Sequence, residues 1–153
     1  ALVETVRRLQ VAPRFLVASP GYLKKRGRPK APEDLTRHDC MLFGAGAERA
    51  ALRLEREGRV LELQVRVRFV VNDTDMLHAA AVAGLGVALV PLFRCTSDLK
   101  QCRLERVLPD WNAPVTPIHA VYPSTRHLSP KVKSFVDHVQ ASMTPPVWET
   151  EMA

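Results

Sequence analysis

Long hydrophobic runs are missing from this sequence of 153 residues. No apolar segment approaches the roughly 20 residues that cross a bilayer, and no charged start with a short apolar core resembles a signal peptide. Cysteine is scarce too, and Cys40, Cys95 and Cys102 form no Cys-x-x-Cys pair. An odd number at these spacings favours reduced, buried thiols over a disulfide framework or a zinc site. These absences predict a cytoplasmic protein that has no membrane partner.

Catalytic and metal-binding motifs are also absent. The five histidines have no metal-ligand spacing, and the chain has no Gly-x-Ser-x-Gly nucleophile motif. Asp73 and Asp75 lie two apart at a predicted helix start, where a negative charge favours the helix dipole more than it serves acid–base chemistry. The Gly-Leu-Gly at 84–86 follows a helix, whereas a dinucleotide fingerprint precedes one. We therefore expect a protein that is not an enzyme and that needs no cofactor.

The composition is that of an ordinary globular protein. Hydrophobic residues make up 46% of the chain and charged residues 25%, which suits one domain or two small lobes. The formal net charge of +6 invites a nucleic-acid interpretation. However, basic residues such as Arg66 and Arg68 alternate with apolar neighbours, as on the solvated face of a sheet. The charge alone therefore does not predict a nucleic-acid partner.

The most informative stretch is NDTDMLHAAAVAGLGVALVP, at 72–91. Asn72 or Asp73 is placed to cap a helix, because its side-chain oxygen satisfies unpaired backbone N–H groups. The spacing of a buried helical face follows at Leu77, Ala80, Ala81, Gly84 and Leu85. After the glycines, the apolar run 87–90 predicts a strand covered on both faces. A helix, a glycine turn and a buried strand in this order indicate an α/β fold.

Other elements are predicted from capping residues and from periodicity. The expected helices lie at 20–26, which Ser19 caps and Gly27 stops, at 32–39, and from 130 onwards, with Val132, Phe135, Val136 and Val139 on one face. The expected strands lie at 11–18, 40–43 and 117–122, and a hairpin at 51–71 turns near Glu57-Gly58. A short helix or irregular lead-in is expected at 1–9, and a short helix or turn with a strand at 98–108.

The blocks of this chain resemble, in order, the effector-binding domain of LysR-type transcriptional regulators. The stretch at 72–91 has the polar start, the Ala- and Gly-rich helix end and the apolar Leu/Val-Pro strand of the second sensor subdomain. Four further blocks match: RFLVASPGYLKKRGRP (14–29), PEDLTRHDCMLF (32–43), DLKQCRLERVLPDW (98–111) and PIHAVYPSTRHLSPKVKSFVDHV (117–139). The chain departs from the family pattern at Ala50-Ala51, where an aromatic residue is common, and at Cys102, where glycine is usual.

The resemblance implies an α/β fold of the periplasmic-binding-protein type II kind, with one complete lobe plus part of the other. Residues 1–18 would be a remnant of lobe I and the first crossing strand, 19–114 lobe II, 115–143 the second crossing strand and last helix of lobe I, and 144–153 a mobile tail. The two crossings are expected near 14–18 and 117–121. Nothing in the sequence resembles the winged helix-turn-helix that begins the family, so the chain looks like the C-terminal part of a regulator.

The family's function would follow from these lobes. A small-molecule effector would bind between them and shift the population of two lobe arrangements. A homo-oligomer would pass this change to promoter DNA through a DNA-binding domain that is absent from this chain. The unpaired strand at 117–122 and the apolar face of the helix at 130–142 predict that the isolated chain self-associates.

The expected effector site lies where the strands end and the next helices begin. Asn72 would donate from its side chain, Phe43 would form an apolar wall, Gly44 a backbone contact, and His119 a contact from the crossing strand. Free N–H groups at a helix start suit a carboxylate, and carboxylates are common inducers in the family. Asp73 brings a like charge to the same turn and argues against a strongly anionic ligand. The alternative is that Asn72 only caps the helix.

A second function competes with this interpretation. Arg26-Gly27-Arg28-Pro29, within the basic stretch 24–30, resembles an AT-hook, whose extended Arg-Gly-Arg core lies in the minor groove of A·T tracts. The chain would then be a stand-alone DNA-binding protein that uses Arg26 and Arg28. The same letters also fit a helix end followed by a proline-rich loop, and a GrP loop occurs at this place in the family.

Overall fold

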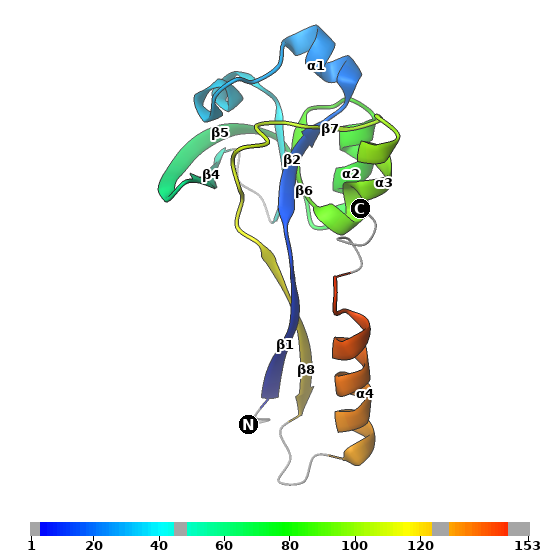
Figure 1. Ribbon diagram of the computed structural model, residues 1–153. Helices are drawn as coiled ribbons and strands as arrows, with labels where there is room; N and C mark the ends of the chain where they lie inside the picture. Colours follow the sequence, from blue (N-terminus) through cyan, green and yellow to red (C-terminus); the bar gives the residue numbers. More distant parts are fainter. Residues whose placement is uncertain (1–3, 45–48, 124–128, 147–153) are drawn as a thin grey trace. The chain divides into compact units, whose positions relative to one another are not determined.

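The computed structural model describes residues 4–44, 49–123 and 129–146 (Figure 1). The chain splits into two compact units. The larger unit is Pro13–Pro114, and the smaller unit combines Ala1–Ala12 with Val115–Ala153. No helix in the described part of the chain is long and apolar enough to cross a membrane. The predicted tail at 144–153 lies mostly outside the described residues.

The larger unit is built on a six-stranded mixed sheet with the strand order β4-β5-β3-β6-β2-β7. Its strands are β2 (Arg14–Ala18), β3 (Cys40–Phe43), β4 (Arg49–Arg56), β5 (Arg59–Val71), β6 (Val87–Pro91) and β7 (Glu105–Arg106). Strand β3 runs parallel to both β5 and β6, whereas the other pairs are antiparallel. Because β3 and β5 are parallel and in register at Phe43 and Val71, their carboxyl ends meet at one edge of the sheet.

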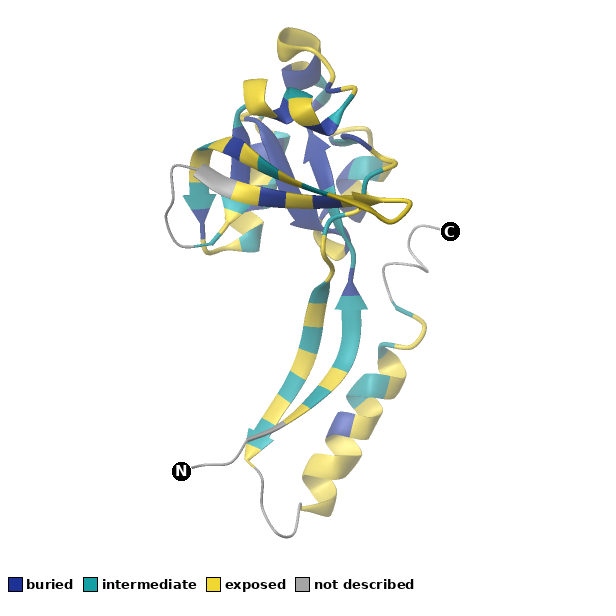
Figure 2. Ribbon diagram, turned by 90° about the vertical axis from the view of Figure 1, so that its left-hand side faces the viewer, coloured by how far each residue is buried: buried dark blue, intermediate teal, exposed yellow. Residues whose placement is uncertain are grey.

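Four helices accompany this sheet: α1 (Pro20–Arg26), the 3-10 helix η1 (Pro32–Arg37), α2 (Thr74–Val82) and α3 (Leu92–Lys100). Figure 2 shows the middle strands in the dark blue of buried residues, and every residue of β6 is buried. Ser19 caps α1 by accepting from the Tyr22 N–H, and Gly27 ends that helix at φ +87°, as predicted. The predicted hairpin is β4 and β5, which turn at Glu57 and Gly58.

The helix and strand predicted at 72–91 are α2 and β6. Asp73 is the residue that caps α2, because its Oδ1 accepts from the backbone N–H groups of Asp75 and Met76 at 2.8 and 2.9 Å. The alternative cap, Asn72, is therefore wrong. Leu85 was predicted to be buried with the helix face, but it lies beyond the helix end and is 44% exposed. Gly86 approaches the Asp39 backbone so closely that an added Cβ would lie 2.2 Å from its carbonyl oxygen.

The smaller unit pairs β1 (Glu4–Ala12) with β8 (Thr116–Pro123) in antiparallel register, and α4 (Pro130–Ser142) follows. Arg7 on β1 donates to Asp137 Oδ1 of α4 at 2.5 Å and also to Gln140. The apolar face predicted for α4 is largely exposed, since Val136 is buried but Phe135 is 68% exposed. Figure 2 shows most of this helix in the yellow of exposed residues.

Three local predictions need correction. Residues 4–12 form β1 rather than a helix or irregular lead-in, because they pair with β8, which lies over a hundred residues away in sequence. The helix expected near 98 begins at Leu92, directly after Pro91. All three cysteines are free thiols, as expected, but only Cys40 and Cys95 are buried, whereas Cys102 is exposed.

The strand predicted at 11–18 is divided at Pro13 between the two units. Residues 14–18, expected to be the first crossing strand, form β2, which pairs with β6 and β7 inside the larger unit. The segment that pairs with β8 is instead β1.

Candidate ligand site

A cavity of about 330 Å³ opens at the carboxyl ends of β3 and β5 in the larger unit. Its lining combines an apolar wall with two guanidinium groups and a segment of backbone: Leu42, Phe43, Ala51, Leu52, Val70 and Leu89, then Arg14 and Arg53, then Gly44 and Pro114. A cavity of this size with an apolar wall and a few charged groups is the usual form of a small-molecule site. It is the best candidate for a ligand site among the described residues.

Arg14 enters the cavity from β2 and is held in place by the backbone. Its Nε donates to the Pro114 carbonyl oxygen at 2.7 Å, which leaves the terminal nitrogens of the guanidinium for other acceptors. Burial lowers the pKa of Arg14 from its ordinary value. The pKa is lowered because burial removes water from around the charged guanidinium. An anion bound beside Arg14 would therefore stabilise its charge.

Arg53 reaches the same cavity from β4. Within the described part of the chain, no carboxylate lies at ion-pair distance from either Arg14 or Arg53. Two unpaired guanidiniums beside an apolar wall are suited to a ligand with one anionic group and an apolar body. Neither arginine was predicted from the sequence as a site residue. Arg53 was hidden in the polar half of a hairpin alternation, and Arg14 looked like an ordinary strand-starting residue.

Two of the predicted site residues, Phe43 and Gly44, line this cavity. Phe43 ends β3 and is 55% exposed, so its ring offers apolar surface to the cavity. The Gly44 N–H is already bonded to the Val71 carbonyl oxygen at 2.9 Å, so this group is not free to donate to a ligand.

The other predicted site residues lie elsewhere. Asn72 and Asp73 follow the end of β5, are exposed and do not line the cavity. Because Asp73 caps α2, its carboxylate occupies the free N–H groups that were expected to hold an anion. His119 is an exposed residue of β8 in the smaller unit, and its contact with a ligand stays a prediction.

The basic stretch at 24–30 does not have the extended form of an AT-hook. Arg26 belongs to the last turn of α1 and donates from Nη2 to the Arg37 carbonyl oxygen at 3.1 Å. Arg28 forms an ion pair with Glu105. A helix end followed by a proline-containing loop is therefore what the structure shows here, and nothing supports the DNA-binding alternative.

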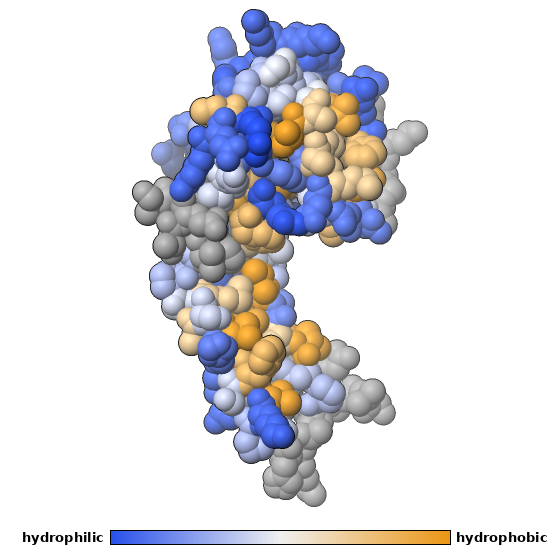
Figure 3. Space-filling model, turned by 90° about the vertical axis from the view of Figure 1, so that its right-hand side faces the viewer, coloured by the Kyte–Doolittle hydropathy of each residue, from blue (hydrophilic) through white to orange (hydrophobic). Residues whose placement is uncertain are grey.

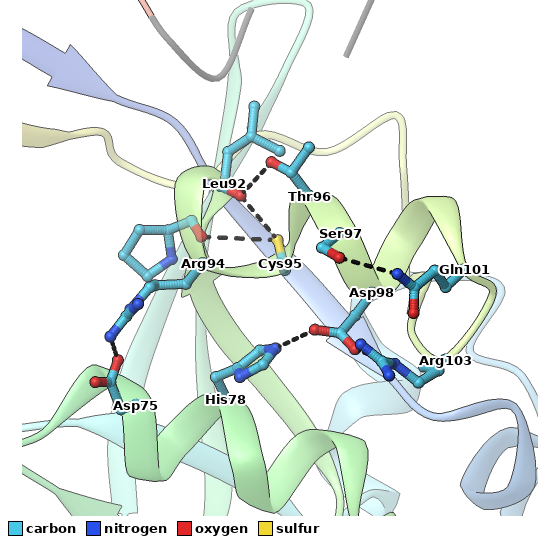
Figure 4. A network of polar contacts seen from close by, with 11 residues as sticks. Asp75, His78, Leu92, Arg94, Cys95, Thr96, Ser97, Asp98, Gln101 and Arg103 are labelled. Carbon is cyan, nitrogen blue, oxygen red and sulfur yellow. Dashed lines mark hydrogen bonds and ion pairs between the residues drawn. The ribbon is translucent and has the colours of Figure 1, made fainter. Parts of the chain in front are cut away.

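Helices α2 and α3 are joined by a polar network at their facing sides (Figure 4). Asp75 pairs with Arg94, while the buried carboxylate of Asp98 binds His78 Nε2 at 2.6 Å and Arg103 Nε at 2.5 Å. Burial raises the pKa of Asp98, but the bonds from His78 and Arg103 outweigh it and hold the pKa below its ordinary value. The described residues contain no group of His, Cys, Asp and Glu that could hold a metal ion. The network links α2 to α3 through Asp75–Arg94 and His78–Asp98.

The family model of the LysR substrate binding domain matches residues 5–144. The chain belongs to this family. Two curated relatives are the HTH-type transcriptional regulator PtxR of Pseudomonas aeruginosa and the HTH-type transcriptional activator AaeR of Escherichia coli. Both are 30% identical to this LysR-family chain, over 81% and 86% of its length. The chain spans 40% and 42% of the length of these relatives.

Solved structures agree with this assignment. The regulatory domain of AphB in Vibrio vulnificus is 29% identical, with a TM-score of 0.70, over 90% of this chain and 69% of that one. The full-length virulence activator AphB of Vibrio cholerae is 26% identical, with a TM-score of 0.76, over 93% of this chain and 48% of that one. The fold is therefore the α/β, type II periplasmic-binding-protein-like fold of LysR regulatory domains. The family consists of transcriptional regulators, not enzymes.

Proposed function

We propose that this chain senses a small carboxylate-bearing effector for a LysR-type transcriptional regulator, and that the effector binds in the cavity beside Arg14, Arg53 and Phe43. The observation that carries this proposal is the pair of unpaired guanidiniums next to an apolar wall. The carboxylate would accept from the two arginines, while the apolar body of the effector would cover Phe43.

In this proposal the anionic group of the effector lies beside Arg14 and Arg53, and not at the start of α2 as the sequence predicted. An anion at the start of α2 would meet the carboxylate of Asp73, which already uses the N–H groups of that turn. The arginines offer a positively charged alternative inside the same unit. Asn72 does not line this cavity, so its expected contact with an effector stays a prediction that this position of the anion does not use.

The response is proposed to be a population shift. An effector that binds one arrangement of the sensor more tightly than another biases the two arrangements by the difference in affinity. In the full-length homo-oligomer, this bias would reach promoter DNA through DNA-binding domains like those that give PtxR and AaeR their HTH-type names. The protein would act in the cytoplasm, where promoter DNA is.

A comparison of acids with their amides tests the proposal. Benzoate and benzamide, phenylacetate and phenylacetamide, and butyrate and butyramide are matched in shape and differ in charge. We expect at least one acid to raise the melting temperature of this chain, because a ligand of the folded state stabilises it by mass action. The matching amide should raise it much less. Equal shifts for acid and amide, or shifts with amides alone, would rule out a carboxylate site.

A further inference from the structure

The end of the larger unit that carries α1 is strongly basic. Between Lys24 and Arg37 there are six basic side chains and only two acidic ones: Lys24, Lys25, Arg26, Arg28, Lys30 and Arg37 against Glu33 and Asp34. Figure 3 shows this end, at the top of the view, in the blue of hydrophilic residues. The charge is thus concentrated on one part of the surface.

Part of this basic segment surrounds a hollow of about 490 Å³ between the end of α1 and η1. The backbone around the hollow is tied down. Asp34 Oδ2 accepts from the Lys30 and Ala31 N–H groups at 2.9 and 3.0 Å, and Arg26 bonds the end of η1. Pro29 is buried and fixes the loop between the two helices. The α1–η1 hollow is therefore a formed feature and not a gap beside a loose loop.

The carboxylate of Asp34 lines the hollow, and Glu33 on η1 has no described ion pair. Asp34 is bonded to two backbone N–H groups, and Glu105 pairs with Arg28. In the part of the chain that the structure describes, Lys25, Lys30 and Arg37 have no carboxylate at ion-pair distance. These three cations repel each other around one hollow, and the Asp34 carboxylate offsets only part of that repulsion, so an anion of several charges between them would lower it further.

We propose that the α1–η1 hollow binds a small phosphate-bearing polyanion of the diphosphate or triphosphate class. Three unpaired cations match an anion of several charges better than they match a monocarboxylate. Arg37 has the planar fork that pairs with two phosphate oxygens, while Lys25 and Lys30 supply mobile point charges. The hollow and the effector cavity share no lining residue, so this ligand would be a second input, separate from the proposed effector.

Calorimetric titration of this chain with inorganic pyrophosphate tests the site. We expect pyrophosphate to bind, and the double variant Lys30→Ala/Arg37→Ala to bind at least about tenfold more weakly, as expected when two charge-assisted contacts are lost. The matched control is Lys131→Ala/Lys133→Ala, which removes two exposed cations from α4 and should leave binding unchanged. Thermal unfolding of both variants verifies that they are folded.

Two further ligands separate phosphate recognition from general charge attraction. Citrate carries several charges without phosphorus, and a short DNA duplex presents phosphates along a backbone. Selective binding of pyrophosphate over citrate supports the proposal. Equal binding of citrate, binding of the duplex without pyrophosphate, no binding of pyrophosphate, or equal loss in the α4 control would each overturn it.

Discussion

The carboxylate of Asp98 on α3 accepts a hydrogen bond from His78 on α2 at 2.6 Å, and it accepts a second one from Arg103 at 2.5 Å. Asp98 is almost fully buried, whereas Arg103 is half exposed. The bond between His78 and Asp98 links α2 to α3, and both helices pack against β6. Figure 4 shows the Asp98 carboxylate between His78 and Arg103.

Replacing that carboxylate should destabilise the domain. We expect Asp98→Ala to lower the free energy of unfolding by about 2 kcal/mol, because two hydrogen bonds to a charged group are lost. Asp110→Ala is the matched control, since Asp110 is exposed and forms no described ion pair. Urea unfolding of the two variants measures the difference. If both variants are as stable as the wild type, the bonds from His78 and Arg103 contribute nothing.

The lowered pKa of Asp98 also leads us to expect that the free energy of unfolding decreases in acid. Its pKa in the folded protein lies below the ordinary value of 3.8, so the folded state favours the ionised form. Its contribution is complete above the ordinary pKa and is lost as the pH falls through the lowered pKa of the folded state. The unfolding free energy of the wild type should therefore fall more steeply below pH 3.8 than that of Asp98→Asn. Parallel curves would contradict this.

The lowered pKa of His38 leads us to expect that stability also depends on pH in a higher range, near pH 6.5. Burial, and then the nearby charge of Arg26, lower the pKa of His38 below its ordinary value of 6.5. The unfolded chain takes up a proton near that value, whereas the folded protein resists it, so stability declines as the pH falls below 6.5. In urea unfolding at several pH values, we expect the free energy of unfolding of His38→Gln to change less below pH 6.5 than that of the wild type. His138→Gln, on the exposed side of α4, is the matched control and should show the same dependence on pH as the wild type.

Gly86 and Gly21 form a matched pair for backbone packing. A Cβ at Gly86 would clash with the Asp39 carbonyl, whereas a Cβ at Gly21 meets nothing within 4 Å. Gly86→Ala should therefore cost about 2 kcal/mol through overpacking. Gly21→Ala, within α1, should be neutral or stabilising, because alanine loses less backbone freedom in a helix. Thermal unfolding distinguishes them, and similar melting temperatures would refute the close approach.

Exposed apolar side chains in the smaller unit lead us to expect that the isolated chain self-associates. Val6 and Val121 lie opposite each other in the β1–β8 register and are 58% and 57% exposed, and Phe135 on α4 is more exposed still. Exposed apolar groups beside unpaired strand edges recruit partners. Sedimentation should show dimers or larger species at tens of micromolar, and fewer of them for Phe135→Ser. A wild-type chain that remains monomeric there would contradict the prediction.

The sequence was most informative where one residue determines a local conformation. Ser19 and Gly27 bound α1 as predicted, and the period-two alternation predicted the hairpin of β4 and β5. These features depend on a side-chain cap, a positive φ angle or alternation along one strand. Each is visible within a few residues of sequence.

The sequence was least informative where distant segments meet. The strand β1 is fixed by pairing with β8, and no local pattern revealed that partner. Arg14 and Arg53 line one cavity although β5, β3 and β6 lie between their strands in the sheet, and no local sequence pattern indicates this. Phe43 and Gly44 could be predicted as site residues because ligands gather at the carboxyl ends of parallel strands. Arg14 and Arg53 could not, because their place in the cavity depends on the order of distant strands in the sheet.

The central claim is tested most directly by calorimetric titration of one stabilising acid against three forms of the chain: wild type, Arg53→Ala and Arg56→Ala. Arg56 lies on the same strand as Arg53 but does not line the cavity. A charge-assisted bond from an arginine to a carboxylate is worth about 1.5–3 kcal/mol, so Arg53→Ala should weaken binding of the acid roughly tenfold or more. The Arg56→Ala variant should bind like the wild type. If Arg53→Ala binds the acid as tightly as the wild type does, the carboxylate does not bind beside Arg53 and the proposed site is wrong.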